Sequence, residues 1–109
     1  MRTALVIPTA ADPYKIDLSE GSLEKLQSAV GGYIQMVEIG PYSMYLNEEG
    51  KMIGLPVNRL ATALWESEYG AGTDIIVGNA VFCGPPDDEG EDTSLSIDQF
   101  YEFAKERVG

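Results

Sequence analysis

Basic side chains are scarce in this sequence, and two of them lie near a predicted helix start. Only seven of the 109 residues are Lys or Arg, and Lys51 and Arg59 flank the turn-forming segment Gly54-Leu55-Pro56. Asn58 is a favourable N-cap residue, so a helix starting there would present free backbone N–H groups beside Arg59 and Thr62. Such groups attract phosphates and carboxylates. The alternatives are a plain cap at Asn58 and an ion pair between Arg59 and an acidic neighbour.

An aromatic residue and an amide extend this candidate site. Tyr33 follows Gly31-Gly32, where the backbone could approach a ligand closely and the ring could stack on a base. Asn47 opens the polar turn that leads to Lys51. The structural alternatives are that the glycines end a helix and that Asn47 shapes a turn. The resulting hypothesis is a non-enzymatic protein that binds a small anionic, nucleotide-like ligand, with six candidate residues: Tyr33, Asn47, Lys51, Asn58, Arg59 and Thr62.

Acidic residues dominate the charge, and their distribution supports an alternative hypothesis. The formal net charge is −11, and no basic residue lies between Leu60 and Ala104. A strongly acidic surface associates quickly with basic partners at low salt. The protein would then occupy a basic surface of another protein, for example by imitating DNA. Solubility alone would also explain the charge. The candidate partner surface consists of Glu66, Glu68, Asp87, Asp88, Glu89, Glu91 and Asp92.

The residues that most often catalyse reactions or bind metals are missing. There is no histidine and only one cysteine, Cys83, which excludes an internal disulfide and multi-cysteine metal sites. The run from Asp87 to Asp92 does not have the spacing of a calcium loop. Glu48 and Glu49 are adjacent and would point apart, so a carboxylate-based hydrolase is the weakest hypothesis. We therefore expect no catalytic residue, metal site or cofactor, and no direct binding to nucleic acid or membranes.

Length and composition favour one folded domain. The chain is 44% hydrophobic, too apolar for a disordered acidic tail, and its length suits a single core. The apolar run from Ala4 to Ile7 is too short for a secretory signal or a membrane span. We therefore expect a single domain over residues 1–109 and a cytoplasmic location.

Hydrophobic periodicity predicts the elements that must position these residues. Strands are expected over residues 2–8, 33–39, 42–46, 51–53 and 74–83, with loops over 10–17 and 84–95. Helices are expected over residues 19–30, from Asn58 to Gly70, and over 96–108, the first capped by Ser19 or Ser22. The predicted fold is α+β, a mostly antiparallel sheet with two or three helices packed on one face. Exposed tyrosines would create a homodimer surface: Tyr42, Tyr45 and Tyr101.

Four ordered sequence blocks carry a family resemblance. They are Leu26–Ile34 (LQSAVGGYI), Asn47–Lys51 (NEEGK), Gly54–Thr62 (GLPVNRLAT) and Asp74–Val81 (DIIVGNAV). Together they resemble a family of small proteins of unknown function encoded by bacteriophages, actinobacterial genomes and other mobile elements. The resemblance implies an accessory role in such an element, with the host cytoplasm as location, and it implies no activity. The blocks do not reach the acidic loop or the last helix.

Overall fold

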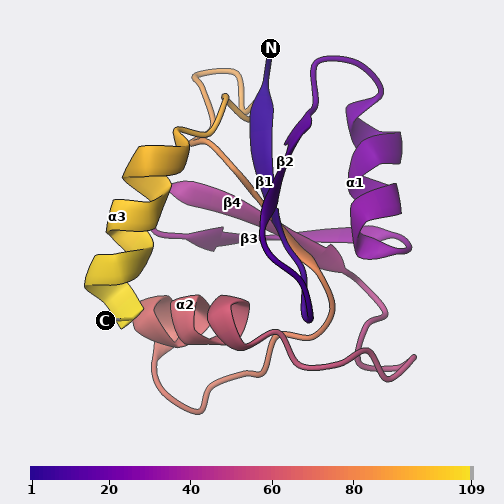
Figure 1. Cartoon of the computed structure of the whole chain (residues 1–109), viewed down its shortest axis with the longest axis vertical. Helices are drawn as coiled ribbons and strands as arrows, with labels where there is room; N and C mark the ends of the chain where they lie inside the picture. Colours follow the sequence, from indigo (N-terminus) through magenta and orange to yellow (C-terminus); the bar gives the residue numbers. More distant parts are fainter. Residues whose placement is uncertain (109) are drawn as a thin grey trace.

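The protein folds as one α+β domain built on a five-stranded antiparallel sheet (Figure 1). The structure is a computed structural model, and it describes residues 1–108. The elements are β1 (Thr3–Ile7), β2 (Tyr14–Asp17), α1 (Ser22–Val30), β3 (Ile34–Ile39), β4 (Tyr42–Asn47), α2 (Arg59–Tyr69), β5 (Ala80–Cys83) and α3 (Ile97–Val108). The strand order is β2-β1-β5-β4-β3, so β2 and β3 are the two edges. The predicted α+β fold class is confirmed.

Both faces of the sheet are covered by helices. Successive side chains of a strand point to opposite faces, so Leu5 and Phe82 pack toward α2 and α3, while Val6 and Val81 pack toward α1. In Figure 1, α1 lies on one side of the sheet and α2 and α3 lie on the other. Two helices therefore share a face, as predicted. The third covers the opposite face, because strands β1 and β5 are apolar at every position except Thr3 and need cover on both sides.

Local capping signals explain most of the helix ends. Asn58 caps α2, since its side chain accepts a hydrogen bond from the N–H of Ala61. Gly31 ends α1 in a left-handed conformation with φ of 81°, as the two glycines predicted. The start of α1 differs from the prediction: its N-cap is Gly21, and neither Ser19 nor Ser22 caps it. In α3, the Ser96 hydroxyl accepts the N–H of Gln99 at 3.4 Å, one half of the predicted capping box.

Three predicted segments are corrected by the structure. Residues 14–17, predicted as loop, form the edge strand β2, which pairs with β1 from Val6↔Tyr14 to Thr3↔Asp17. Residues 51–53, predicted as a strand, lie in a series of turns between β4 and α2. The long strand predicted over residues 74–83 is reduced to β5, and the preceding residues contribute only the isolated bridge Val57↔Val77.

The predicted tyrosine surface for a homodimer does not form. Tyr42 is buried, and its ring packs edge-on against Phe100 and Phe103 at centroid distances of 5.3 and 5.1 Å. Tyr45 is half-buried and donates its hydroxyl hydrogen to Asp92. Of the three tyrosines, only Tyr101 is exposed. The aromatic rings of β4 and α3 therefore build the core instead of a contact surface.

Candidate functional site

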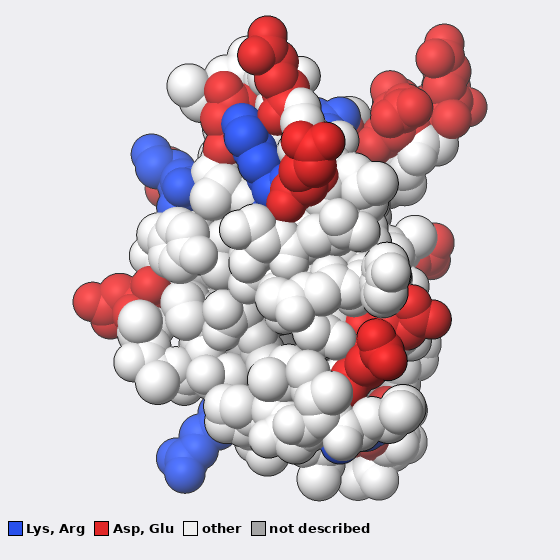
Figure 2. All heavy atoms as spheres, turned by 90° about the vertical axis from the view of Figure 1, so that its right-hand side faces the viewer, with Lys and Arg blue, Asp and Glu red and all other residues white. Residues whose placement is uncertain are grey.

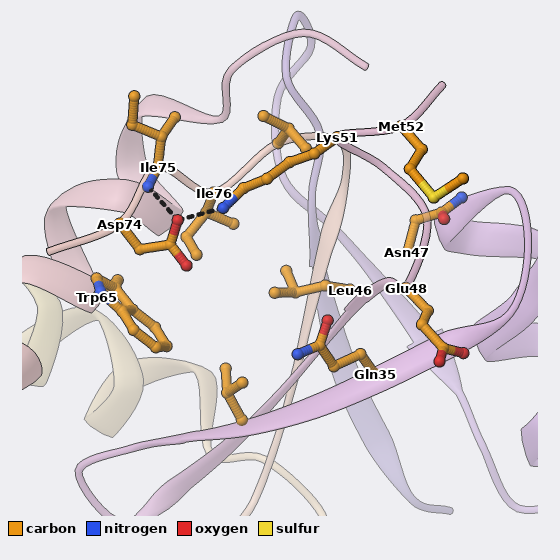
Figure 3. Close-up of a pocket in the computed structure, with 12 residues that line it drawn as sticks. Gln35, Leu46, Asn47, Glu48, Lys51, Met52, Trp65, Asp74, Ile75 and Ile76 are labelled. Carbon is orange, nitrogen blue, oxygen red and sulfur yellow. Dashed lines mark hydrogen bonds and ion pairs between the residues drawn. The ribbon is translucent and has the colours of Figure 1, made fainter. Parts of the chain in front are cut away.

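A cavity of about 200 Å³ lies between the β3–β4 hairpin, α2 and the segments on either side of α2. We call it the Lys51 cavity (Figure 3). Its walls include the aliphatic side chains of Leu46 and Ile76, the Gln35 amide and the Trp65 ring. Figure 3 shows Trp65 and Gln35 directed toward the central space from opposite sides, while the Glu48 carboxylate turns away from it. The cavity therefore has polar and apolar walls in about equal measure, with the amides of Gln35 and Asn47 among its polar groups.

An ion pair crosses the rim of the Lys51 cavity. The Lys51 ammonium donates a hydrogen bond to the Asp74 carboxylate, and the same carboxylate oxygen accepts the backbone N–H of Ile75 at 2.7 Å. The hydrogen bond from Lys51 holds the pKa of Asp74 below its ordinary value. The Lys51 side chain is 61% exposed, so water screens this pair and its net contribution to stability is small. An anion from solution can reach Lys51, but it must compete with Asp74.

Trp65 is a cavity residue that the ligand hypothesis did not include. The sequence places it only in the apolar stripe of a predicted helix. In the structure, the Trp65 indole N–H donates to the hydroxyl of Thr73 at 2.9 Å, and the ring lies 4.2 Å from that of Tyr69. These contacts fix the indole while one part of it borders the cavity. As the only tryptophan in the sequence, Trp65 stands out as a candidate site residue. No pattern in the neighbouring residues, however, relates it to Lys51.

A second, more open hollow of about 520 Å³ adjoins the first at Asn47. We call it the Tyr33 hollow, because the Tyr33 ring on its wall is 66% exposed. The buried Asn47 amide donates to the carbonyl of Val30 at 3.1 Å and accepts the N–H of Glu49 at 2.8 Å. A Cβ on Gly32 would lie 2.9 Å from that amide nitrogen, which explains the second glycine. Asn47 therefore separates the two hollows and shapes both.

The structure separates the other predicted ligand residues from these hollows. Asn58 is 1% exposed, and its amide donates to the carbonyls of Ile7 at 2.8 Å and Gly78 at 3.0 Å. The Thr62 hydroxyl bonds to the backbone of Ile76, accepting its N–H at 2.9 Å. Both side chains therefore hold α2 against neighbouring segments. Arg59 is exposed, lines neither hollow and makes no ion pair within residues 1–108.

The predicted acidic partner surface is divided between two ends of the molecule. Glu68, on α2, forms an ion pair with Arg107 at 2.9 Å and accepts the N–H of Gly40, while Glu66 accepts the N–H of Gly72. The acidic loop lies at the opposite end in Figure 1, beside the start of β1. Its carboxylates, over residues 87–92, are exposed except that of Asp92, which is half-buried and accepts the hydroxyl hydrogen of Tyr45. The seven carboxylates therefore do not form one continuous surface.

Charge is unevenly distributed over the face that carries α1. Figure 2 shows charged side chains at its upper end and along its margins, and an uncharged area in the middle.

Within residues 1–108, no group of three His, Cys, Asp or Glu side chains is arranged to hold a metal ion. No helix in the same range is long and apolar enough to span a membrane.

Comparison with known proteins identifies a family. Neither the curated proteins nor the solved structures include a match to the chain. A family model described as a domain of unknown function (DUF3846) matches residues 1–107. The match includes the acidic loop and nearly all of α3, so these segments belong to the common domain, although the four sequence blocks did not reach them. The chain is therefore a member of the DUF3846 family of domains of unknown function.

Proposed function

We propose that this protein is a non-enzymatic binding protein whose Lys51 cavity takes the ring of a small nucleotide-like ligand. The observation that carries the proposal is the convergence of Lys51, Trp65 and Gln35 on one cavity that has both apolar and polar walls. Apolar walls with a few placed polar groups are typical of small-molecule sites. The Trp65 ring would contact the base, the Gln35 amide would bond to its edge, and Lys51 would meet an attached phosphate.

The size and charge of the site restrict the ligand. A volume of about 200 Å³ is below the roughly 300–1,000 Å³ typical of drug-sized ligands, so only part of the ligand would be enclosed. The remainder would extend over Asn47 toward the exposed ring of Tyr33. Lys51 is the only cation on either wall and is paired with Asp74. A nucleoside monophosphate therefore fits this charge balance better than a polyphosphate.

The resemblance of the four sequence blocks suggests how such binding would be used. The four sequence blocks resemble proteins of bacteriophages and mobile elements. A protein of this kind could act in the host cytoplasm by sequestering a nucleotide signal of a host defence system. This accessory role requires only tight binding and no catalytic residue.

Titration of the protein with the four common nucleoside monophosphates tests the proposal. Because Trp65 is the only tryptophan, its fluorescence reports on the cavity directly. Lys51→Ala should weaken binding about tenfold, since it removes a charge-assisted hydrogen bond. Asp74→Asn should strengthen binding, because it frees Lys51 for the ligand. Arg59→Ala is the matched control: it removes an exposed cation that lines neither hollow, and affinity should not change. Unchanged Trp65 fluorescence at millimolar ligand would refute the proposal.

A second candidate function is binding to a basic host protein through the acidic loop alone. The exposed position of Asp88, Glu89 and Glu91 supports it. Hydrogen bonds within the loop also support it, because they hold the loop in one conformation. The Asp87 carboxylate accepts the N–H groups of Glu89 at 2.9 Å and Glu91 at 3.0 Å. A host protein captured at low salt should be lost when Asp88 and Glu89 are replaced by Asn and Gln. Capture that survives these changes would exclude the loop.

A further inference from the structure

The two edges of the sheet differ in how well they are protected. The edge strand β2 has only four residues, carries Lys15 and Asp17, and follows Pro13. Its Asp17 carbonyl also accepts a hydrogen bond from the Lys25 ammonium at 2.6 Å. Short length, charged side chains and nearby proline are features by which proteins prevent unwanted strand pairing. The β2 edge is therefore closed to a further strand.

The β3 edge lacks most of these protections. It has six residues, pairs with β4 without a bulge from Ile34↔Asn47 to Ile39↔Tyr42, and contains no proline or lysine. Residues 33–37 are uncharged in a chain whose net charge is −11. Met36, near the middle of the strand, is 48% exposed. An exposed and regular edge that is uncharged up to Val37 favours pairing with another strand.

The hairpin register shows which backbone groups face outward. In a hairpin with a two-residue turn, the residues flanking the turn form a hydrogen-bonded pair, and such pairs then alternate along the strands. The backbone N–H and C=O groups of Ile34, Met36 and Glu38 therefore point away from β4. The Glu38 carbonyl accepts the Tyr69 hydroxyl at 2.5 Å, which agrees with this assignment. The outward-facing backbone groups of Ile34 and Met36 make no hydrogen bond within residues 1–108.

We propose that β3 pairs antiparallel with β3 of a second copy of this chain, about a two-fold axis at Gln35. Ile34 of each copy would then exchange two backbone hydrogen bonds with Met36 of the other, giving four in all. The apolar side chains of Ile34 and Met36 would lie opposite each other, and the two Gln35 amides would meet at the axis. The two sheets would join into one of ten strands, with the isologous contact typical of dimers.

Charge favours pairing of two copies at the β3 edge over pairing at the β2 edge, which carries Lys15 and Asp17. Two chains of −11 repel each other, so contact requires a surface without charge. In the proposed register Glu38 lies opposite Gly32 of the second copy, so no carboxylate faces another. The Tyr69–Glu38 hydrogen bond also stays intact, because pairing uses only Ile34 and Met36. Gln35 and Val37 line the Lys51 cavity, so the dimer would bring the two cavities to either side of the axis.

Light scattering coupled to size-exclusion chromatography tests the proposal on the full chain. We expect the mass of two chains, with a dimer dissociation constant that falls as NaCl rises from 0.15 to 0.5 M, because salt screens the repulsion. The backbone amides of Ile34 and Met36 should exchange hydrogen more slowly as protein concentration increases. A monomer at millimolar concentration in 0.5 M NaCl overturns the proposal, as does exchange at these amides that is independent of concentration.

Three variants distinguish this edge from other contacts. Gln35→Lys places two cations together at the axis and should raise the dissociation constant at least about tenfold, although it lowers the total charge. Met36→Pro removes two of the four interchain donors and leaves the β3–β4 hydrogen bonds in place, so it should also give monomers. Glu38→Lys is the matched control, adding a cation outside the paired residues, and should leave a dimer. Folded dimers of both Gln35→Lys and Met36→Pro would overturn the proposed edge.

Discussion

At the scale of single residues, Asn58 illustrates how a buried amide holds distant segments together. It caps α2 through the N–H of Ala61 and donates both amide hydrogens to the carbonyls of Ile7 and Gly78. Burying an amide is costly unless each polar atom is hydrogen-bonded, and here all are. The residue type that makes a good ligand for a phosphate is used here to join β1, α2 and the segment before β5.

Cys83 should make the stability of the protein fall as the pH rises into the alkaline range. Burial raises the pKa of its thiol from 9.0 to about 12, so the folded thiol stays neutral where the unfolded thiol ionises. Unfolding then releases a proton above pH 9, and the free energy of unfolding should fall by about 1.4 kcal/mol per pH unit. Urea unfolding at pH 8, 9 and 10 measures this slope. Burial also raises the pKa of Tyr45, which extends the loss above pH 10.

The variant Cys83→Ala isolates this effect. It should lower stability at pH 8 by leaving a small cavity, yet its free energy of unfolding should change much less between pH 9 and 10. Other groups that titrate in this range are common to both proteins. Equal slopes for the two proteins would show that the thiol is not the source.

At the scale of elements, the junction between β5 and the acidic loop depends on Gly84. A Cβ at this position would lie 2.5 Å from the carbonyl oxygen of Ser94 and 2.7 Å from that of Thr93. These are backbone atoms held by the hydrogen bond from Gly84 N–H to Thr93, so they cannot move aside cheaply. Gly84→Ala should therefore destabilise the fold by about 3 kcal/mol, as measured by urea unfolding.

Gly90→Ala provides the comparison within the same loop. Gly90 has a φ of 81° and nothing within 4 Å of its Cβ position, so alanine there would add only backbone strain of about 1 kcal/mol. The order of the two effects is the informative result. If Gly90→Ala cost as much as Gly84→Ala, close packing at the junction would not be the reason.

At the scale of the whole molecule, the net charge of −11 opposes the compact state. Raising NaCl from 0.05 to 0.5 M should increase the melting temperature by several degrees, because the screening length becomes shorter than the spacing of exposed carboxylates. The doubly substituted chain Asp88→Asn, Glu89→Gln should start from a higher melting temperature and respond less to salt. A melting temperature that falls with salt in both proteins would contradict self-repulsion. Calorimetry at a fixed low protein concentration separates this effect from association.

Some elements could be predicted from the sequence because their signals are local. The periodic stripe in α2, the two glycines after α1 and the alternation in β3 and β4 each act over a few residues. The strand β2 was missed because three of its four residues are exposed and only Ile16 packs inward, so it forms by pairing with β1. Residues 51–53 were predicted as a strand because they follow a polar turn that ends in Gly50, but in the structure the turns continue through them.

The sequence by itself determined the α+β class, the three helices and the apolar segments that become β1 and β5, since these follow from residue spacing and capping. Only the tertiary structure decided that α1 lies opposite α2 and α3, because both faces of β1 and β5 are apolar and either could receive it. The tertiary structure also decided which residues form the candidate site. Of the six predicted ligand residues, Asn47 and Lys51 line the cavity, whereas Asn58 and Thr62 form internal hydrogen bonds. Trp65 and Asp74 join Lys51 through folding alone, since residues distant in sequence become neighbours only when the core packs.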